Sequence, residues 1–324
     1  GEFAEAGRKG PSEEDKARRE ARLCDKKCQE VMQQLQGITD VPGLAEFITG
    51  PQFEYPVADL VLTQGNVDRL RPSDHIQAPK KNLPKDPPYV GQLGECPRGG
   101  YNCSRGRRAP DVKRFSSCAL VANSGAVKAA PFGKSIDSHE CVMRMNQAPT
   151  QGHERHVGTR TTLRMLNKKW TTLYTDAHDG RKVLLPNEGA NSTLLVSRVK
   201  ATDFEHLASL ARKLRKDLRV QYVSQGVMTR SRWMLHAFRD GWGHLNGKRY
   251  RGGEAPSSGF IGFYVLLQVC ERIAVYGMSR EKSTNRAESQ FSYHYFSNYV
   301  DSVQLRAHPH HSFELEGDLI AATA

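Results

Sequence analysis

The sequence has no long apolar run and few cysteines. None of its 324 residues lies in a stretch with the ~18 consecutive apolar residues that a membrane-spanning helix needs. The longest apolar run, residues 260–269, is interrupted by Gly262 and Gln268. Seven cysteines, at positions 24, 28, 96, 103, 118, 141 and 270, are too few and too dispersed for a small disulfide scaffold, and no C-x-x-C pair indicates structural zinc. We therefore expect a globular protein with a core of its own.

Several ligand-binding signatures are also missing. The net charge is +12, which favours an anionic partner, but no zinc-finger spacing, RNP-type aromatic motif or basic-region heptad accompanies it. Nucleic acid is therefore disfavoured. No G-x-G-x-x-G follows the first predicted strand, which argues against a dinucleotide-dependent dehydrogenase. No two aspartates have the Asp-x-Asp spacing that holds a metal in many nucleotide-sugar transferases; the nearest pair is Asp176 and Asp179.

The most informative stretch runs from Ser117 to Arg164. A strand-like run, Cys118 to Val121, breaks at Asn123-Ser124-Gly125, and a second apolar strand, Cys141 to Met145, ends on Asn146. Ligands in open α/β sheets bind beyond the carboxyl ends of the strands, where Asn can hydrogen-bond a phosphate or ribose and Gly permits close approach to the backbone. The pattern predicts a nucleotide site. The alternative is an ordinary strand-to-turn junction.

Further strands and helices are predicted downstream. Strands are expected at residues 161–166, 183–185, 194–196 and 219–223. A helix is expected over residues 204–218, with Leu207, Leu210, Ala211 and Leu214 on one face. Alternation of this kind indicates an α/β sheet with helices on its faces.

A second candidate site begins at Pro256 and Ser257, which open a helix that is apolar nearly all round and therefore buried. The helix start at Ser258 and Gly259 attracts a phosphate or carboxylate, and a strand over residues 272–276 ends at Gly277. A core helix capped by Ser is the alternative interpretation.

Two histidine-containing blocks follow. Residues 293–296, Tyr-His-Tyr-Phe, are interpreted as strand residues with one satisfied imidazole. Residues 308–316 contain three histidines in four positions, which could bind zinc or be exposed and inert.

In this order, the four blocks resemble the large, small, third and very short motifs of the eukaryotic sialyltransferases, glycosyltransferase family 29. The resemblance implies a mostly parallel central sheet flanked by helices, a Rossmann-like, single-domain α/β fold of the GT-A-like variety. It also implies that a Cys at the place of Cys118 is bridged to one at the place of Cys270.

The resemblance implies inverting transfer of sialic acid from CMP-sialic acid to a glycan hydroxyl, with no metal and no cofactor. The very short motif is a His with a Glu five residues later, so His311 is assigned as general base and Glu316 a structural role. His294 is the second catalytic candidate. Donor binding is assigned to Asn123, Ser124, Gly125, Asn146, Ser257, Ser258, Gly259, Gly277 and Tyr295.

The acceptor is predicted from a finer similarity. Residues 140–150, ECVMRMNQAPT, are most similar to the branch that joins sialic acid α2,6 to N-acetylgalactosamine of O-glycans and gangliosides, although the galactoside α2,3 branch shares R-M-N-x-A-P-T. Loops over residues 233–253, with Trp242 and His244, are expected to choose the acceptor. A noncatalytic nucleotide- or sialic-acid-binding module is the remaining alternative.

Residues 1–110 are predicted to form a stem-like extension and residues 111–324 the catalytic domain. Within residues 1–37, a helix carries an apolar stripe at positions 21, 24, 28, 31 and 35, with a coiled-coil seam as the alternative, and residues 42–110 are rich in Pro, Gly and Arg. Cys24 and Cys28 are expected to pair elsewhere, with Cys96 and Cys103 as the nearest candidates.

The cellular setting is predicted to be the Golgi lumen. Sequons at Asn102 and Asn191, taken with the resemblance, favour a glycoprotein of an oxidising lumen. The first residues, Gly1-Glu2-Phe3, are interpreted as a cloning remnant, and a type II signal-anchor is expected to precede the present sequence and to provide its membrane attachment.

Overall fold

The computed structural model describes residues 30, 33–35, 37–70, 79, 81–85, 115–176, 184–185, 188–278, 291–296 and 310–323. Its centre is a six-stranded sheet in the order β5-β4-β3-β2-β1-β6, in which every neighbouring pair is parallel. The strands are β1 (Cys118–Val121), β2 (Cys141–Met145), β3 (Leu163–Leu166), β4 (Thr193–Val196), β5 (Arg219–Tyr222) and β6 (Ile273–Tyr276). The strands β1 to β4 are buried along their whole length, as a parallel sheet covered on both faces requires.

The strand order fixes where a ligand can bind. From β1 the chain adds β2, β3, β4 and β5 in one direction, and then returns to add β6 on the other side of β1. The direction of winding therefore reverses between β1 and β6. In open α/β sheets ligands bind at such a reversal, beyond the carboxyl ends of the strands.

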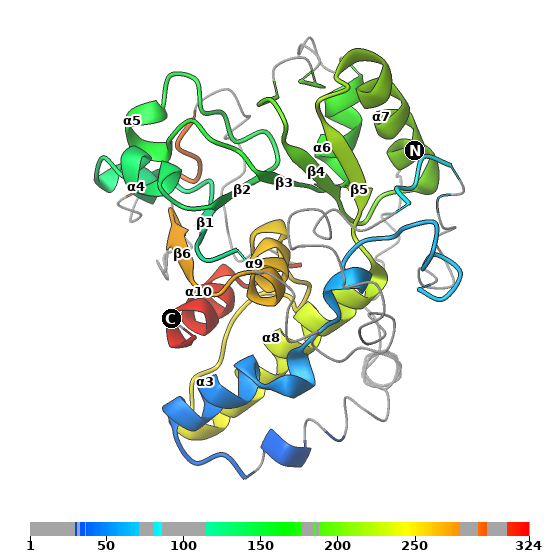
Figure 1. Cartoon of the computed structure of the whole chain (residues 1–324). Coiled ribbons are helices and arrows are strands. Elements are labelled where there is room, and N and C mark those ends of the chain that lie inside the picture. Colours follow the sequence, from blue (N-terminus) through cyan, green and yellow to red (C-terminus); the bar gives the residue numbers. More distant parts are fainter. Residues whose placement is uncertain are drawn as a thin grey trace, which may run out of the picture.

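One face of the sheet is covered by α8 (Gln225–Asn246), α9 (Ser258–Val269) and α10 (Phe313–Ala322), with α3 (Val41–Thr49) lying along α8 (Figure 1). The apolar cluster on this face includes Leu120 of β1, Met143 of β2 and most of α9. Gly262 lets α9 lie close to the sheet, because a Cβ there would be 2.9 Å from the sulfur of Met143. As predicted, α9 is apolar nearly all round and buried, and the Ser cap of the alternative interpretation is also present, at Ser257.

The other face is covered by two groups of helices (Figure 1). Over β1 and β2 lie η4 (Gly125–Ala129), α4 (Gly133–Asp137) and α5 (Glu154–Val157), packed against Ala119, Val121 and Val142. Over the remaining strands lie α6 (Lys168–Thr175) and α7 (Ala201–Leu214), packed against residues such as Leu194 and Val196. Because alternate strand residues point to opposite faces, each strand contributes to both layers.

Residues before the predicted boundary near Pro110 also enter the core. Helix α3 and the short helices η1 (Pro51–Phe53) and η2 (Val57–Asp59) belong to the same apolar cluster as α8, and Leu44 and Ile48 are fully buried. Val61 forms an antiparallel bridge with Val223. Pro110 itself and most of the predicted N-terminal helix lie outside the described residues, so the boundary and that helix stay predictions.

Three predicted elements differ from the structure. The described residues of the expected strand at 183–185 are not in a strand; Leu185 is buried against α6 and α7 instead. The helix predicted over 204–218 is α7, which ends at Leu214, and this leucine is 55% exposed because it lies in the last, solvent-facing turn. The described residues 291–296 form bends rather than a strand.

A fourth difference concerns the acceptor loop expected over residues 233–253. Residues up to Asn246 belong to α8, the longest described helix, and Trp233 is buried within it. Only residues 247–253 form a loop, which leaves α8 at Gly247 in a left-handed conformation. The residues expected to line a loop thus contribute largely to the core.

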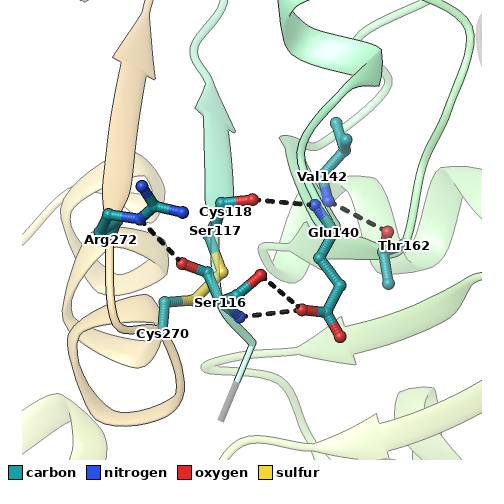
Figure 2. Close-up of a disulfide and its surroundings, with 8 residues drawn as sticks. All are labelled: Ser116, Ser117, Cys118, Glu140, Val142, Thr162, Cys270 and Arg272. Carbon is teal, nitrogen blue, oxygen red and sulfur yellow. Dashed lines mark hydrogen bonds between the residues drawn. A yellow bond between two sulfur atoms is a disulfide. The ribbon is translucent and has the colours of Figure 1, made fainter.

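A disulfide joins Cys118 to Cys270 and ties the amino end of β1 to the chain just before β6, with their Cα atoms 6.1 Å apart. Figure 2 shows the supporting contacts: the amide and hydroxyl of Ser116 donate to the Glu140 carboxylate, and Arg272 donates to the carbonyl of Ser116. Cys141, opposite Cys118 in the sheet register, is a buried free thiol. Cys24, Cys28, Cys96 and Cys103 lie outside the described residues.

No helix within the part of the chain that the structure describes is both long enough and apolar enough to span a bilayer.

Candidate active site

Polar residues follow the first four strands of the sheet where each strand ends. Asn123 follows β1, Asn146 follows β2, Asn167 follows β3 and Arg198 follows β4. Asn146 and Arg198 have left-handed backbone conformations, with φ of 52° and 57°, and so turn the chain sharply. The first two were predicted as site residues. Asn167 and Arg198 were missed, although the same signal, a polar residue just beyond an apolar strand, marks them in the sequence.

The side chain of Asn123 has an unsatisfied acceptor. Its amide oxygen is buried and finds no hydrogen bond within the described residues, whereas its main-chain carbonyl accepts one from the Tyr295 amide at 2.9 Å. Buried polar atoms are nearly always hydrogen-bonded in folded proteins. An orphan acceptor at the end of β1, beside the reversal in the sheet, is a group that a ligand or water would satisfy.

Asn146 is held in place by its neighbours. Its amide oxygen accepts a hydrogen bond from the Asn167 amide at 3.2 Å, and its carbonyl accepts one from Arg164 at 2.8 Å. Arg164 is in turn paired with the buried Glu188 at 2.5 Å. The pair keeps both charges compensated away from solvent and fixes the turn after β2.

The segment 291–296 lies against the carboxyl end of β1. The Gly125 amide donates to the carbonyl of Ser292 at 2.8 Å, and a Cβ at residue 125 would overlap that serine. The absence of a side chain at Gly125 therefore allows Ser292 of the same chain to lie close to its backbone. Gly277, with a φ of 69°, accepts a hydrogen bond from the Ser124 amide at 3.2 Å, so Ser124, Gly125 and Gly277 lie together. Their role in donor binding stays a prediction.

The third block contributes two core residues, Tyr295 and Phe296, and the half-buried ring of His294. Tyr295 is buried, its hydroxyl donates to the carbonyl of Pro149 at 2.7 Å, and burial raises the pKa of that hydroxyl to about 12. The ring of His294 stacks on Phe296 with centroids 4.9 Å apart. The roles of both residues in donor binding stay predictions.

The start of α9 is joined to α10 by Glu316. The amide and hydroxyl of Ser257 donate to the two Glu316 oxygens at 2.7 and 2.5 Å, while the same hydroxyl caps α9 by accepting from the Phe260 amide at 3.2 Å. Burial raises the pKa of Glu316 to about 7, although the Ser257 hydrogen bonds and the nearby Arg198 oppose the shift. These contacts place the Glu316 carboxylate and the Ser257 hydroxyl at the junction of α9 and α10. The structural role assigned to Glu316 stays a prediction.

Arg198 links the end of β4 to the same helix start. Its guanidinium donates to the carbonyl of Pro256 at 3.0 Å and to the hydroxyl of Ser258 at 3.3 Å. Among the described residues, a Cβ at Gly259 would meet the Ser257 hydroxyl at 3.5 Å and nothing closer, so this part of the structure leaves room beside the helix start. An anion at this helix start would find the positive end of the α9 dipole and a nearby arginine.

The imidazole of His311 has a defined orientation. Its Nδ1 lies 2.6 Å from the carbonyl oxygen of Ala255. A carbonyl only accepts hydrogen bonds, so Nδ1 carries the proton and the neutral ring has Nε2 as its basic atom. Glu316 is not the partner of His311, despite their spacing in the motif, because its carboxylate binds Ser257.

His311 lines an open pocket of about 560 Å³ at the ends of β3 and β4. The lining is basic, and none of the described residues that form it is a carboxylate; they are Asn167, Lys168, Lys169, Thr172, Arg198, Ala255, His310 and His311. The third block lies close by, because Phe313 is 6.0 Å from the ring of His311 and 6.4 Å from that of Tyr293. The third and fourth blocks are thus adjacent in space.

Two further sequence predictions involve residues that lie partly outside the described part of the chain. Among the described residues, no group of three or more His, Cys, Asp or Glu side chains could hold a metal, but His308 lies outside them, so a zinc site at the histidine cluster is untested. Asn191 is exposed in the turn before β4, while Asn102 lies outside the described residues. Glycosylation at both sequons stays a prediction.

Comparison with known proteins gives relatives that are named as sialyltransferases. The chain is 30% identical over 210 residues to the beta-galactoside alpha-2,6-sialyltransferase 2 of Takifugu rubripes, covering 60% of this chain and 36% of the relative. It is 33% identical over 202 residues to the mouse (Mus musculus) alpha-N-acetyl-neuraminyl-2,3-beta-galactosyl-1,3-N-acetyl-galactosaminide alpha-2,6-sialyltransferase, covering 58% of this chain and 52% of the relative.

A third relative carries a different linkage in its name. The mouse CMP-N-acetylneuraminate-beta-galactosamide-alpha-2,3-sialyltransferase 2 is 28% identical over 222 residues, covering 66% of this chain and 55% of its own length. The chain thus spans between 36 and 55% of the length of these three curated relatives. Because the profile of glycosyltransferase family 29 (sialyltransferase) matches residues 101–322, which include every strand of the sheet and the whole of this basic site, the chain belongs to that family.

Proposed function

We propose that this chain transfers sialic acid from CMP-sialic acid to a glycan hydroxyl, with inversion at the anomeric carbon and without a metal ion. The observation that carries the proposal is the orientation of His311. Its protonated Nδ1 is bound to a backbone carbonyl, which leaves a basic Nε2 on a histidine that lines the pocket at the carboxyl ends of the strands.

In the proposed reaction the bond between the anomeric carbon and the CMP phosphate oxygen breaks while an acceptor hydroxyl attacks from the opposite face. The hydroxyl proton passes to Nε2 of His311, and the electron pair of the broken bond stays on the phosphate. The sugar becomes oxocarbenium-like as negative charge builds on the leaving group. Groups that stabilise this charge lower the barrier most.

The start of α9 is suited to stabilise the leaving phosphate. Ser258 and Gly259 occupy its first turn, and Arg198 donates to the Ser258 hydroxyl. The dipole of the helix adds to the positive charge of the arginine. Asn123, with its unsatisfied amide oxygen, is assigned to the nucleotide, as are Asn146 and the cluster of Ser124, Gly125 and Gly277.

Metal independence follows from the same assignment. The sequence has no Asp-x-Asp pair to hold a divalent ion against the phosphate. The positive charge that such an ion would supply comes in this proposal from Arg198 and the helix start, and His294 is assigned as a hydrogen-bond donor to the phosphate. No cofactor is needed, because CMP-sialic acid is itself the activated donor.

For the acceptor we propose α2,6 transfer to N-acetylgalactosamine of O-glycans or gangliosides. The spelling of residues 140–150 supports this, as does the 33% identity to the mouse relative whose name specifies a sialylated galactosyl-N-acetylgalactosaminide. Lys168 and Lys169 line the pocket beside His311, where a carboxylate on the acceptor would be attracted. Galactoside α2,3 transfer is the alternative, favoured by the relative with that linkage in its name.

The setting we propose is the Golgi lumen, with glycoproteins or glycolipids as acceptors. The buried Cys118–Cys270 disulfide supports an oxidising compartment, and the exposed Asn191 is accessible for glycosylation.

The test is CMP release from CMP-sialic acid in the presence of EDTA, on desialylated and on sialylated mucin-type glycopeptides. We expect acceptor-dependent release that His311→Ala lowers roughly 10²- to 10⁴-fold, because proton transfer to the base is lost. His206→Ala, which removes an exposed histidine of α7, should behave like the unmodified protein. A faster reaction with the sialylated acceptor would support the α2,6 assignment.

Two results would overturn the proposal. Activity that disappears with EDTA and returns with Mn²⁺ or Mg²⁺ would refute metal independence. Binding of CMP without release from the donor, on either acceptor, would support the noncatalytic binding module instead.

A further inference from the structure

Three basic side chains on α8 lie around the carboxylate of Glu254. Arg232, His236 and Arg239 are spaced so that they share one side of the helix. Their nitrogens lie 3.6, 3.3 and 3.6 Å from the carboxylate oxygens of Glu254, in the loop between α8 and α9. Arg239 also donates to the carbonyl of Gly253 at 3.2 Å, so the loop is held by both its side chain and its backbone.

The held loop lies directly against His311. Gly252 has a φ of 96°, and a Cβ there would overlap the carbonyl of His311, so only glycine fits at this contact. The Ala255 amide donates to the His310 carbonyl at 3.0 Å, and the Ala255 carbonyl accepts from His311 Nδ1 at 2.6 Å. The residue after Glu254 thus makes the hydrogen bond that selects the histidine tautomer.

We propose that Glu254 is a positioning residue for His311. Bound among the three basic side chains of α8, its carboxylate fixes the loop so that the next carbonyl, that of Ala255, receives the proton of Nδ1 and leaves Nε2 basic. The proposal rests on the proposed function only for its effect on rate, since the orientation of the ring can be observed without turnover.

The loop has two anchors, and Glu254 provides the one nearer α8. On the α9 side, Pro256 is held by Arg198 and Ser257 by Glu316. Between these anchors, the Ala255 carbonyl contacts Nδ1 of the imidazole. Release of Glu254 lets the Ala255 carbonyl move away, and the neutral ring then distributes its proton between Nδ1 and Nε2.

A merely stabilising role would give a different result. The side chain of Glu254 is 33% exposed, and ion pairs at such exposure add little to folding stability. Asp217 offers a matched control, because it is 34% exposed and pairs with Arg215 at 2.6 Å after α7, outside the candidate site. If Glu254 acted only through stability, Glu254→Gln and Asp217→Asn would have the same effects.

The experiment is nitrogen NMR of the protein labelled at its histidine rings, with the His311 signals assigned by their loss in His311→Gln. In the unmodified protein we expect a neutral ring protonated at Nδ1. In Glu254→Gln and Glu254→Ala the signals should shift toward a mixture of tautomers. In the CMP-release assay kcat should fall roughly 10- to 100-fold, with the KM for CMP-sialic acid within about twofold, because only the base is misplaced. Asp217→Asn should change neither signal nor rate.

Arg239→Gln weakens the same cluster from α8 and should shift the His311 signals in the same direction, which keeps the test decisive if the Glu254 variants do not fold. Unchanged His311 signals in these variants would overturn the proposal, whatever happens to the rate. If His311→Ala kept full activity, the proposed function would fail, but the ring signals would still show whether Glu254 sets the tautomer.

Discussion

At the scale of single residues, Glu316 combines complete burial with two short hydrogen bonds from Ser257. Its pKa is raised from about 4.5 to about 7 because burial disfavours the charged form. The folded protein therefore holds a proton that the unfolded chain releases. The stability from this group is fully present below pH 4.5 and is lost as the pH rises through 7.

We expect Glu316→Gln to remove this pH dependence. The amide can accept from the Ser257 backbone and donate to its hydroxyl, as the protonated acid would. The free energy of unfolding of the unmodified protein should fall by about 3 kcal/mol between acid and mildly alkaline pH because of this residue, whereas that of the variant should not. Urea unfolding at a series of pH values measures this. Glu314→Gln, in a partly exposed pair with Lys248, is the control, and equal slopes for both variants would refute the expectation.

A residue of the candidate site could be predicted from the sequence only where a local pattern marks it. Asn123 and Asn146 follow apolar strands, and Ser257 and Ser258 open an apolar helix, so elementary rules found them. The Ala255 carbonyl and Glu254 could not be found in this way, because they act through contacts with α8 and residues 310–311, which are distant along the chain. A backbone carbonyl also has no sequence signature at all.

At the scale of elements, most of the strands were predictable because they are short, largely apolar runs with a polar or glycine residue within two positions of their end; β5, with Arg219 and Gln221, is the least apolar of them. Helix α8 was not. Glycines at 226 and 241 count against a helix, yet a Cβ at residue 226 would overlap Tyr55, and one at residue 241 would be 2.6 Å from Leu44. The glycines are needed for close approach of the segment around α3, a tertiary contact that no local pattern reveals.

The disulfide between β1 and the end of α9 gives a prediction at this scale. It closes a loop with a sequence separation of 152 residues, so its loss should lower the free energy of unfolding by roughly 5 kcal/mol in the chain-entropy description. Urea unfolding of Cys118→Ala/Cys270→Ala measures this loss of stability.

Cys141→Ala is the matched control, since it removes a buried sulfur beside Cys118 without removing a bond. Burial raises the pKa of the Cys141 thiol to about 12, so it should not exchange with the disulfide. Equal midpoints for both variants would contradict the prediction.

At the scale of the whole molecule, the two ends of the sheet differ in role. The amino ends carry the disulfide and the contacts of Ser116, Glu140 and Arg272, which hold β1, β2 and β6 together (Figure 2). The carboxyl ends carry the polar residues, the basic pocket and His311. The helices α3, α8, α9 and α10 lie together on one side of the sheet (Figure 1). They connect the two ends because their apolar side chains form one continuous cluster with those of the sheet.

This continuity predicts that the folded body begins well before residue 110. Leu44 is fully buried against α8, so Leu44→Ala should cost about 2–5 kcal/mol of stability. Val41→Ala, at an exposed position on the same helix, should change it by less than about 0.5 kcal/mol. A shortened chain of residues 111–324 loses all of α3, η1 and η2 and should not unfold cooperatively, whereas one of residues 30–324 should. If the shorter chain unfolded at the same midpoint and released CMP, residues 41–63 would be the dispensable stem that the sequence suggested, and their burial would contribute nothing to the site.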